Sequence, residues 1–189
     1  MKTLTVTGLA LACLLAVGSA DAKPRNVADP EAPRALTAEG PVQVQWSDPA
    51  QFTELRQSRN RRDAQRGDWV ETLAEHLRKQ ASKQLPEGQK LDVTITDIKL
   101  AGDYEPWHGP NFDDVRFMRD VYPPRISLQF TLTDANGQVI EQGERKLSDS
   151  GYLFNSSRPS NTDPLRYEKR LLDEWVRREF QSENRTAGR

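Results

Sequence analysis

The sequence predicts an α+β domain in two layers: a small, mainly antiparallel sheet of about four strands, with two helices packed on one face. Three segments alternate apolar and polar side chains, the period of a half-buried strand: 42–46, 91–96 and 126–133. Two others, 69–84 and 165–180, repeat apolar residues at helical spacing. Both helices need an apolar surface and each strand offers one, so a helical layer against a sheet is the consistent assembly.

The first 22 residues have the layout of a cleaved export signal. Lys2 opens a short positive start, the stretch 4–17 is almost wholly apolar, and small residues at Ala20 and Ala22 precede a cut before Lys23. The apolar run is short for a membrane-spanning helix, and polar chain follows it throughout. We therefore expect a signal peptide at 1–22 and an exported, periplasmic protein with no transmembrane segment in the mature chain.

The composition of the mature chain excludes several functional classes. Cleavage removes Cys13, the one cysteine, so disulfides and thiolate chemistry are excluded. Apolar residues continue after Cys13, which argues against a lipid-anchored cysteine. The net charge stays at −1, whereas a general nucleic-acid binder needs a basic surface. The sequence gives no cofactor signature, and we expect no cofactor.

A proline-rich stretch separates the signal from the domain. Residues 23–41 lack apolar periodicity, which predicts a flexible leader; the domain spans 42–180, and a disordered tail covers 181–189. After the strand at 42–46, five arginines lie within 56–66. They are either a contact for an anionic partner or a solvated segment balanced by acids elsewhere.

The middle of the chain alternates a helix with strands. Asp68 and Glu71 are spaced as a capping pair for the helix at 69–84. Alternation in the next strand breaks at Asp97, which predicts a bulge. The strand at 126–133 leads through a turn at 134–137 to a polar edge strand at 138–147.

A long connection at 101–125 is crowded with aromatic, proline and charged residues. Loops of this length in compact domains are usually functional or mobile. Tyr104, Trp107 and Tyr122 are candidate partner-binding residues, because loop aromatics supply contact area at low entropic cost. The alternative is that they fold back over one end of the core.

Asp163 and Pro164 mark the start of the last helix, as cap and first-turn proline. Glu168 falls on its apolar stripe, so its carboxyl group is either neutral or paired with an arginine from the long connection.

Several short motifs, read in order, resemble one known family. They are Ser47-Asp48-Pro49 with Phe52-Thr53, the run 96–102, the run 119–126, and Tyr167-Glu168-Lys169 with Trp175. Together they resemble domain-of-unknown-function family 3016, a family of exported proteobacterial proteins, over about 42–180. The resemblance implies an envelope setting and no particular activity. Its motifs include both oddly placed acids, which makes Asp97, Arg125 and Glu168 a candidate polar cluster.

Two functions are compatible with these observations. The first is a non-catalytic binding or accessory domain of the cell envelope, whose partner is an unidentified envelope protein or ligand and which uses the long connection or the uncharged face of the sheet. The alternative is a metal-assisted hydrolase, with His108, Asp103 and Asp113 of the acidic loop as ligands. The spacing of these three matches no established metal loop.

Overall fold

The computed structural model describes residues 26–154 and 162–186. The expected signal peptide at 1–22 and the final residues 187–189 lie outside this part. In chain order the elements are β1 (Val42–Trp46), η1 (Pro49–Gln51), α1 (Thr53–Gln57), α2 (Arg61–Ala64), α3 (Trp69–Gln84), β2 (Lys90–Lys99), β3 (Asp103–Tyr104), η2 (Pro106–His108), η3 (Pro110–Phe112), β4 (Arg116–Phe117), β5 (Arg125–Thr133), β6 (Val139–Ser148) and α4 (Arg166–Thr186).

The main sheet has four strands in the order β1-β2-β5-β6. The pairs β2–β5 and β5–β6 are antiparallel, whereas β1 and β2 run parallel. The predicted α+β class and mostly antiparallel sheet are confirmed, and the parallel pair makes the sheet mixed. It arises because α3 connects β1 to β2 and returns the chain to the starting end of the sheet.

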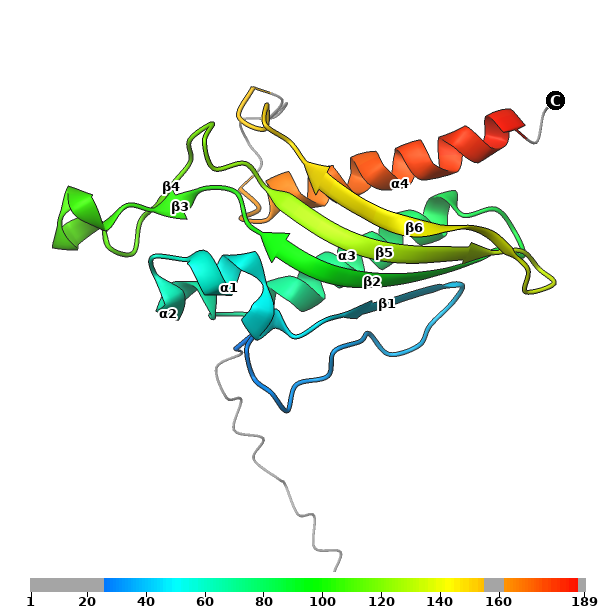
Figure 1. The fold of residues 1–189 in the computed structure, drawn as a ribbon, viewed down its shortest axis with the longest axis horizontal. Helices are drawn as coiled ribbons and strands as arrows, with labels where there is room; N and C mark the ends of the chain where they lie inside the picture. The colour runs from blue at the N-terminus through cyan, green and yellow to red at the C-terminus, as the bar shows by residue number, and fades with distance from the viewer. Residues whose placement is uncertain (1–25, 155–161, 187–189) are drawn as a thin grey trace, which may run out of the picture.

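The core joins the two long helices to the sheet. Leu73 and Leu77 of α3 and Leu172 of α4 are fully buried in one cluster with the apolar residues of β1, β2 and β5. Burying each such leucine stabilises the fold by roughly 1.5–3 kcal/mol. The Trp175 and Phe130 rings meet edge to face at 5.7 Å between centroids, which packs α4 against β5. In Figure 1, α3 and α4 lie behind the sheet.

The predicted bulge in β2 is confirmed. The register with β5 shifts between Ile95 and Asp97, so Ile98 returns to the buried side opposite Ile126. The bulge lets β2 keep its apolar residues in the core on both sides of an inserted residue.

Residues 26–41, predicted to form a flexible leader, run beside β1. The Leu36 N–H donates to the Val44 carbonyl at 3.0 Å, and the Trp46 N–H donates to the Arg34 carbonyl at 2.9 Å. Further upstream, Val27 packs against the core. These bonds satisfy backbone groups on the outer edge of β1.

The ends of the last helix differ in detail from the expectation. The Asp163 carboxylate accepts a hydrogen bond from the Leu165 N–H at 2.8 Å, as expected of a cap, and regular helix begins at Arg166. The helix continues to Thr186, inside the stretch predicted as a tail.

Residues 103–117, which we call the arm, project from the end of the sheet. The two short strands β3 and β4 pair antiparallel and carry η2 and η3 at the far end (Figure 1). The arm occupies most of the long connection that the sequence singles out.

Candidate functional site

The base of the arm is built on a buried carboxylate, Glu54 of α1, which is fully shielded from solvent. It accepts hydrogen bonds from Lys99 Nζ at 3.0 Å and from Arg116 Nη1 and Nη2 at 2.8 and 3.0 Å. Burial alone would raise the pKa of Glu54, but the bonds and charges of Arg116 and Lys99 bring it below its ordinary value. Glu54 is therefore an ionised acid holding two cations, and it ties α1 to the end of β2 and to β4.

A second carboxylate, Glu105, holds the middle of the arm. It is 2% exposed and accepts hydrogen bonds from Arg119 Nε and Nη2 at 2.8 and 2.7 Å and from the Tyr122 hydroxyl at 3.1 Å, and its carboxylate lies 2.8 Å from His108 Nε2. These contacts, Arg119 first, lower the pKa of Glu105 to about 2. The bidentate arginine pair gives this part of the arm a fixed geometry.

Aromatic rings gather at the tip of the arm. The His108 ring stacks on Phe117 at 4.7 Å, and Phe112 approaches both rings at 6.3 Å. The Trp107 ring lies 6.2 Å from His108 between centroids and is 61% exposed, with the Arg59 guanidinium 5.2 Å from its ring centroid. The tip thus presents a large aromatic surface on a frame anchored by ion pairs.

The three candidate partner-binding residues have different environments. Tyr104 is 7% exposed and lies under the Arg116 guanidinium, and Tyr122 is half-buried against Glu105. Trp107 faces solvent. Tyr104 and Tyr122 thus fold back into the domain, whereas Trp107 is exposed, and partner binding by Trp107 stays a prediction.

The members of the candidate polar cluster bond to different groups. The Asp97 carboxylate accepts from Thr53 at the start of α1, and Arg125 is exposed at the beginning of β5. Glu168 is 1% exposed, and its Oε1 accepts from the Ala101 N–H at 2.6 Å. An ion pair between Glu168 and Arg116 was one expectation, but Arg116 bonds to Glu54 instead.

The surroundings of Glu168 favour the neutral form of its carboxyl group. Its Oε2 atom is buried and has no hydrogen-bond partner in the described part of the chain. Burial raises the pKa of Glu168, and the Ala101 N–H offsets this only in part.

The residues considered as metal ligands do not form a coordination sphere. Asp103 pairs with Arg59 at 3.0 Å and accepts from the Tyr104 N–H, His108 contacts Glu105, and Asp113 is exposed at the tip. Across residues 26–154 and 162–186, no three His, Cys, Asp or Glu side chains are placed to hold a metal ion.

The arginine-rich stretch at 56–66 runs from the last two residues of α1 through α2. Arg59 contributes to the arm through Asp103 and Trp107, and Arg66 pairs with Asp63 at 3.2 Å. The expected capping pair before α3 is wrong in detail, because the Asp68 side chain makes no capping hydrogen bond to the helix.

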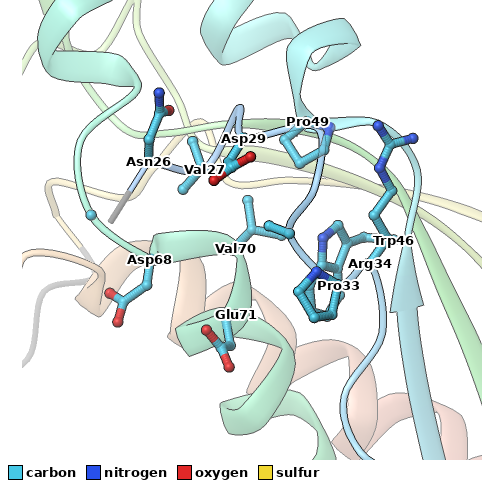
Figure 2. Close-up of a pocket in the computed structure, with 12 residues that line it drawn as sticks. Asn26, Val27, Asp29, Pro33, Arg34, Trp46, Pro49, Asp68, Val70 and Glu71 are labelled. Carbon is cyan, nitrogen blue, oxygen red and sulfur yellow. The ribbon is translucent and has the colours of Figure 1, made fainter. Parts of the chain in front are cut away.

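A cavity of about 290 Å³ lies away from the arm, between residues 26–34 and α3. Val27, Trp46 and Val70 form apolar parts of its lining. Figure 2 shows the side chains of Asp68, just before α3, and Glu71, in its first turn, extending away from them. No buried, unpartnered polar atom of the described residues belongs to its lining.

Sequence reasoning missed Glu54 and Lys99. Glu54 and Lys99 are 45 residues apart in sequence, and Glu54 and Arg116 are 62 apart. No short-range sequence pattern therefore predicts that these side chains meet. The one available signal was the apolar pair Phe52 and Leu55, both buried, which flanks Glu54 at helical spacing.

These features define an α+β domain whose mixed sheet carries a projecting arm with an ion-paired base. Across the described residues, no helix combines the length and apolar character needed to cross a membrane. The chain belongs to the family described as Protein of unknown function (DUF3016), whose sequence model matches residues 40–178. That match confirms the family resemblance.

No curated protein matches the chain. Among solved structures, it is similar to one titled "Crystal structure of a putative lipoprotein from Caulobacter crescentus CB15", at 17% identity over 58% of this chain and 79% of that chain. The TM-score of 0.35 is too low for this likeness to support an argument about function.

Proposed function

We propose that this protein is an exported, periplasmic, non-catalytic binding domain that engages an envelope protein through the tip of the arm. The observation that carries the proposal is the contrast between Trp107, which is 61% exposed, and the buried ion pairs beneath it. A rigid frame that presents an exposed aromatic side chain lowers the entropic cost of association.

The composition of the surface supports the arm as the contact region. Large hydrophobic side chains exposed along or just after the arm are Trp107, Phe112, Val115, Met118 and Val121. A gathering of such residues on one projection is typical of an interaction site, whereas single exposed apolar residues are ordinary. The partner we propose is therefore a protein with an apolar recess.

A non-catalytic role is supported by the state of the ionisable groups in the arm. Asp103, Glu105 and His108 each contact a neighbouring side chain or backbone group that holds the arm together. Groups committed to structural bonds are poor candidates for proton transfer or metal binding.

In this proposal, α3 and α4 cover one face of the sheet. The other face then presents uncharged polar residues such as Gln45, Thr94 and Gln129, which are the second possible contact surface.

Site-specific photo-crosslinking in the bacterial envelope tests the proposal. A photoreactive phenylalanine analogue at position 107 should yield a discrete adduct, and the same analogue at Gln129 or Val139 should not. The purified Trp107→Ala variant should keep its fold and bind the identified partner at least about tenfold more weakly, as loss of a central aromatic contact predicts. An adduct formed at Gln129 but not at position 107 would place the contact on the sheet and refute the role of the arm.

A further inference from the structure

A second cavity, of about 470 Å³, lies between the α2–α3 junction, the base of the arm and the first turn of α4. We propose that it binds a small organic cation, a primary ammonium compound, recognised by Glu168. The site is separate from the exposed tip and does not depend on the partner proposed above. Its volume is within the range of small-molecule sites.

Glu168 is the first reason for assigning a ligand to this cavity. It lines the cavity, it is 1% exposed, and its Oε2 atom lacks a hydrogen-bond partner in the described structure. A buried carboxyl oxygen without a donor destabilises a fold, so such an atom beside a cavity indicates a donor supplied from outside. An ammonium group offers three donors, and its positive charge favours the ionised form of Glu168, so binding would release the proton that burial favours on the empty carboxyl group.

The charges of the lining favour a cation over an anion. Arg116 lines the cavity, but its guanidinium is already engaged by both Glu54 oxygens and by the carbonyls of residues 100, 101 and 102. The other lining cation, Arg66, pairs with Asp63. The lining also carries Asp163, which pairs with Lys169 Nζ at 2.6 Å, and Asp68, so that carboxyl groups outnumber guanidinium groups in it.

The other walls suit the carbon skeleton of an amine. Trp69 and Tyr104 contribute aromatic surface, and the Trp69 indole N–H is already bonded to the Ala64 carbonyl at 3.0 Å. Aromatic surfaces favour cations and apolar groups alike. Met118 is 37% exposed and has a flexible side chain, so it is the wall residue that can move to let a ligand reach Oε2.

Titration with benzylamine, followed by two-dimensional ¹H–¹⁵N NMR, tests the assignment. Benzylamine should shift the Trp69 indole signal saturably, whereas benzyl alcohol and benzoate should bind at least about tenfold more weakly, because neither brings a positive charge to Glu168. Glu168→Gln keeps the size of the side chain and removes its charge, so it should weaken benzylamine binding by a similar factor.

Two further variants keep the test decisive. Met118→Trp should block benzylamine binding by filling the cavity while leaving Glu168 intact. If Glu168→Gln fails to fold, Met118→Trp serves as the test variant in its place. Trp107→Ala should leave benzylamine affinity unchanged, which separates this site from the arm. The proposal is overturned if benzylamine does not saturate, if benzoate binds as well, or if both Glu168→Gln and Met118→Trp bind benzylamine like the unmodified protein.

Discussion

The carboxylate of Asp97 takes both hydrogen bonds that Thr53 offers, from its backbone N–H at 2.6 Å and from its hydroxyl at 2.7 Å. Thr53 is the first residue of α1, and the residue before it, Phe52, provides no side-chain cap. Asp97 therefore caps α1 from another element, and the bulge beside it places the carboxylate there. This acid has a structural partner that accounts for its position.

Asp97→Ala should lower the free energy of unfolding by about 1–2 kcal/mol, the usual effect of removing a helix cap. Thr53→Ala should cost less, because the backbone N–H remains to bond Asp97. Urea denaturation of both single variants and the double variant measures the coupling. Strictly additive effects would contradict the cap.

Glu54→Gln should destabilise the protein by about 3–5 kcal/mol, because Lys99 and Arg116 would keep buried charges without their counter-ion. The pKa of Glu54 is lowered in the fold, so its contribution is present above the ordinary carboxyl value and is lost as pH falls through the lowered one. Thermal and urea unfolding at neutral pH measure the effect. Asp92→Asn, at an exposed position of β2, is the matched control and should change stability by less than about 0.5 kcal/mol.

Glu105→Gln should loosen the arm while leaving the sheet intact. The variant removes the charge that Arg119 contacts, and amide hydrogen exchange in residues 103–117 should then accelerate while β5 stays protected. Because the Glu105 pKa is lowered to about 2, the tether should hold above pH 4.5 and weaken as pH falls toward 2. Asp113→Asn, exposed at the tip, should leave exchange in the arm unchanged; equal acceleration in both variants would refute the tether.

Truncating Trp107 should affect stability much less than truncating Trp175. Trp107→Ala removes an exposed side chain and should change the free energy of unfolding by less than about 0.5 kcal/mol. Trp175→Ala opens a cavity between α4 and the sheet and should cost about 3–5 kcal/mol. Equilibrium unfolding of the two variants checks this, and a large loss for Trp107→Ala would show that this ring belongs to the core.

Glu168 should make stability depend on pH in the opposite sense to Glu54. Burial raises its pKa in the fold above the ordinary value of 4.5, with Glu54 adding to the shift and Arg116 opposing it. Its stabilising contribution is then full below pH 4.5 and is lost as pH rises through the raised value. The stability of the unmodified protein relative to Glu168→Gln should therefore fall from pH 4 to pH 8. A difference that stays constant would mean that Glu168 is not shifted.

Local periodicity predicted much of the fold. The helix at 69–84 has the predicted bounds, the strand 126–133 is one residue longer in the structure, and the phase break at Asp97 is a real bulge. Each of these depends on neighbours within a few residues. The direction of β1 was also within reach, because a strand, a helix and a strand in succession favour a parallel pair.

The arm and the ion pairs at its base were not predictable in the same way. The strands β3 and β4 have two residues each, too few to show alternation. Glu54 gains its role from partners brought together by the folded sheet. Glu168 was expected to be either neutral or paired with an arginine of the long connection, and one of those arginines, Arg116, pairs with Glu54. Tertiary contacts decide both cases, and a single sequence carries little trace of them.

The strand-like stretch at 34–36 has a practical meaning for how the domain should be handled. A fragment beginning at Pro41 would leave backbone amides and carbonyls of β1 without partners. Such an unpaired strand edge can pair with the same edge of another molecule and lead to aggregation. Because residues 34–36 pair with this edge, a recombinant domain should retain the proline-rich stretch to avoid self-association.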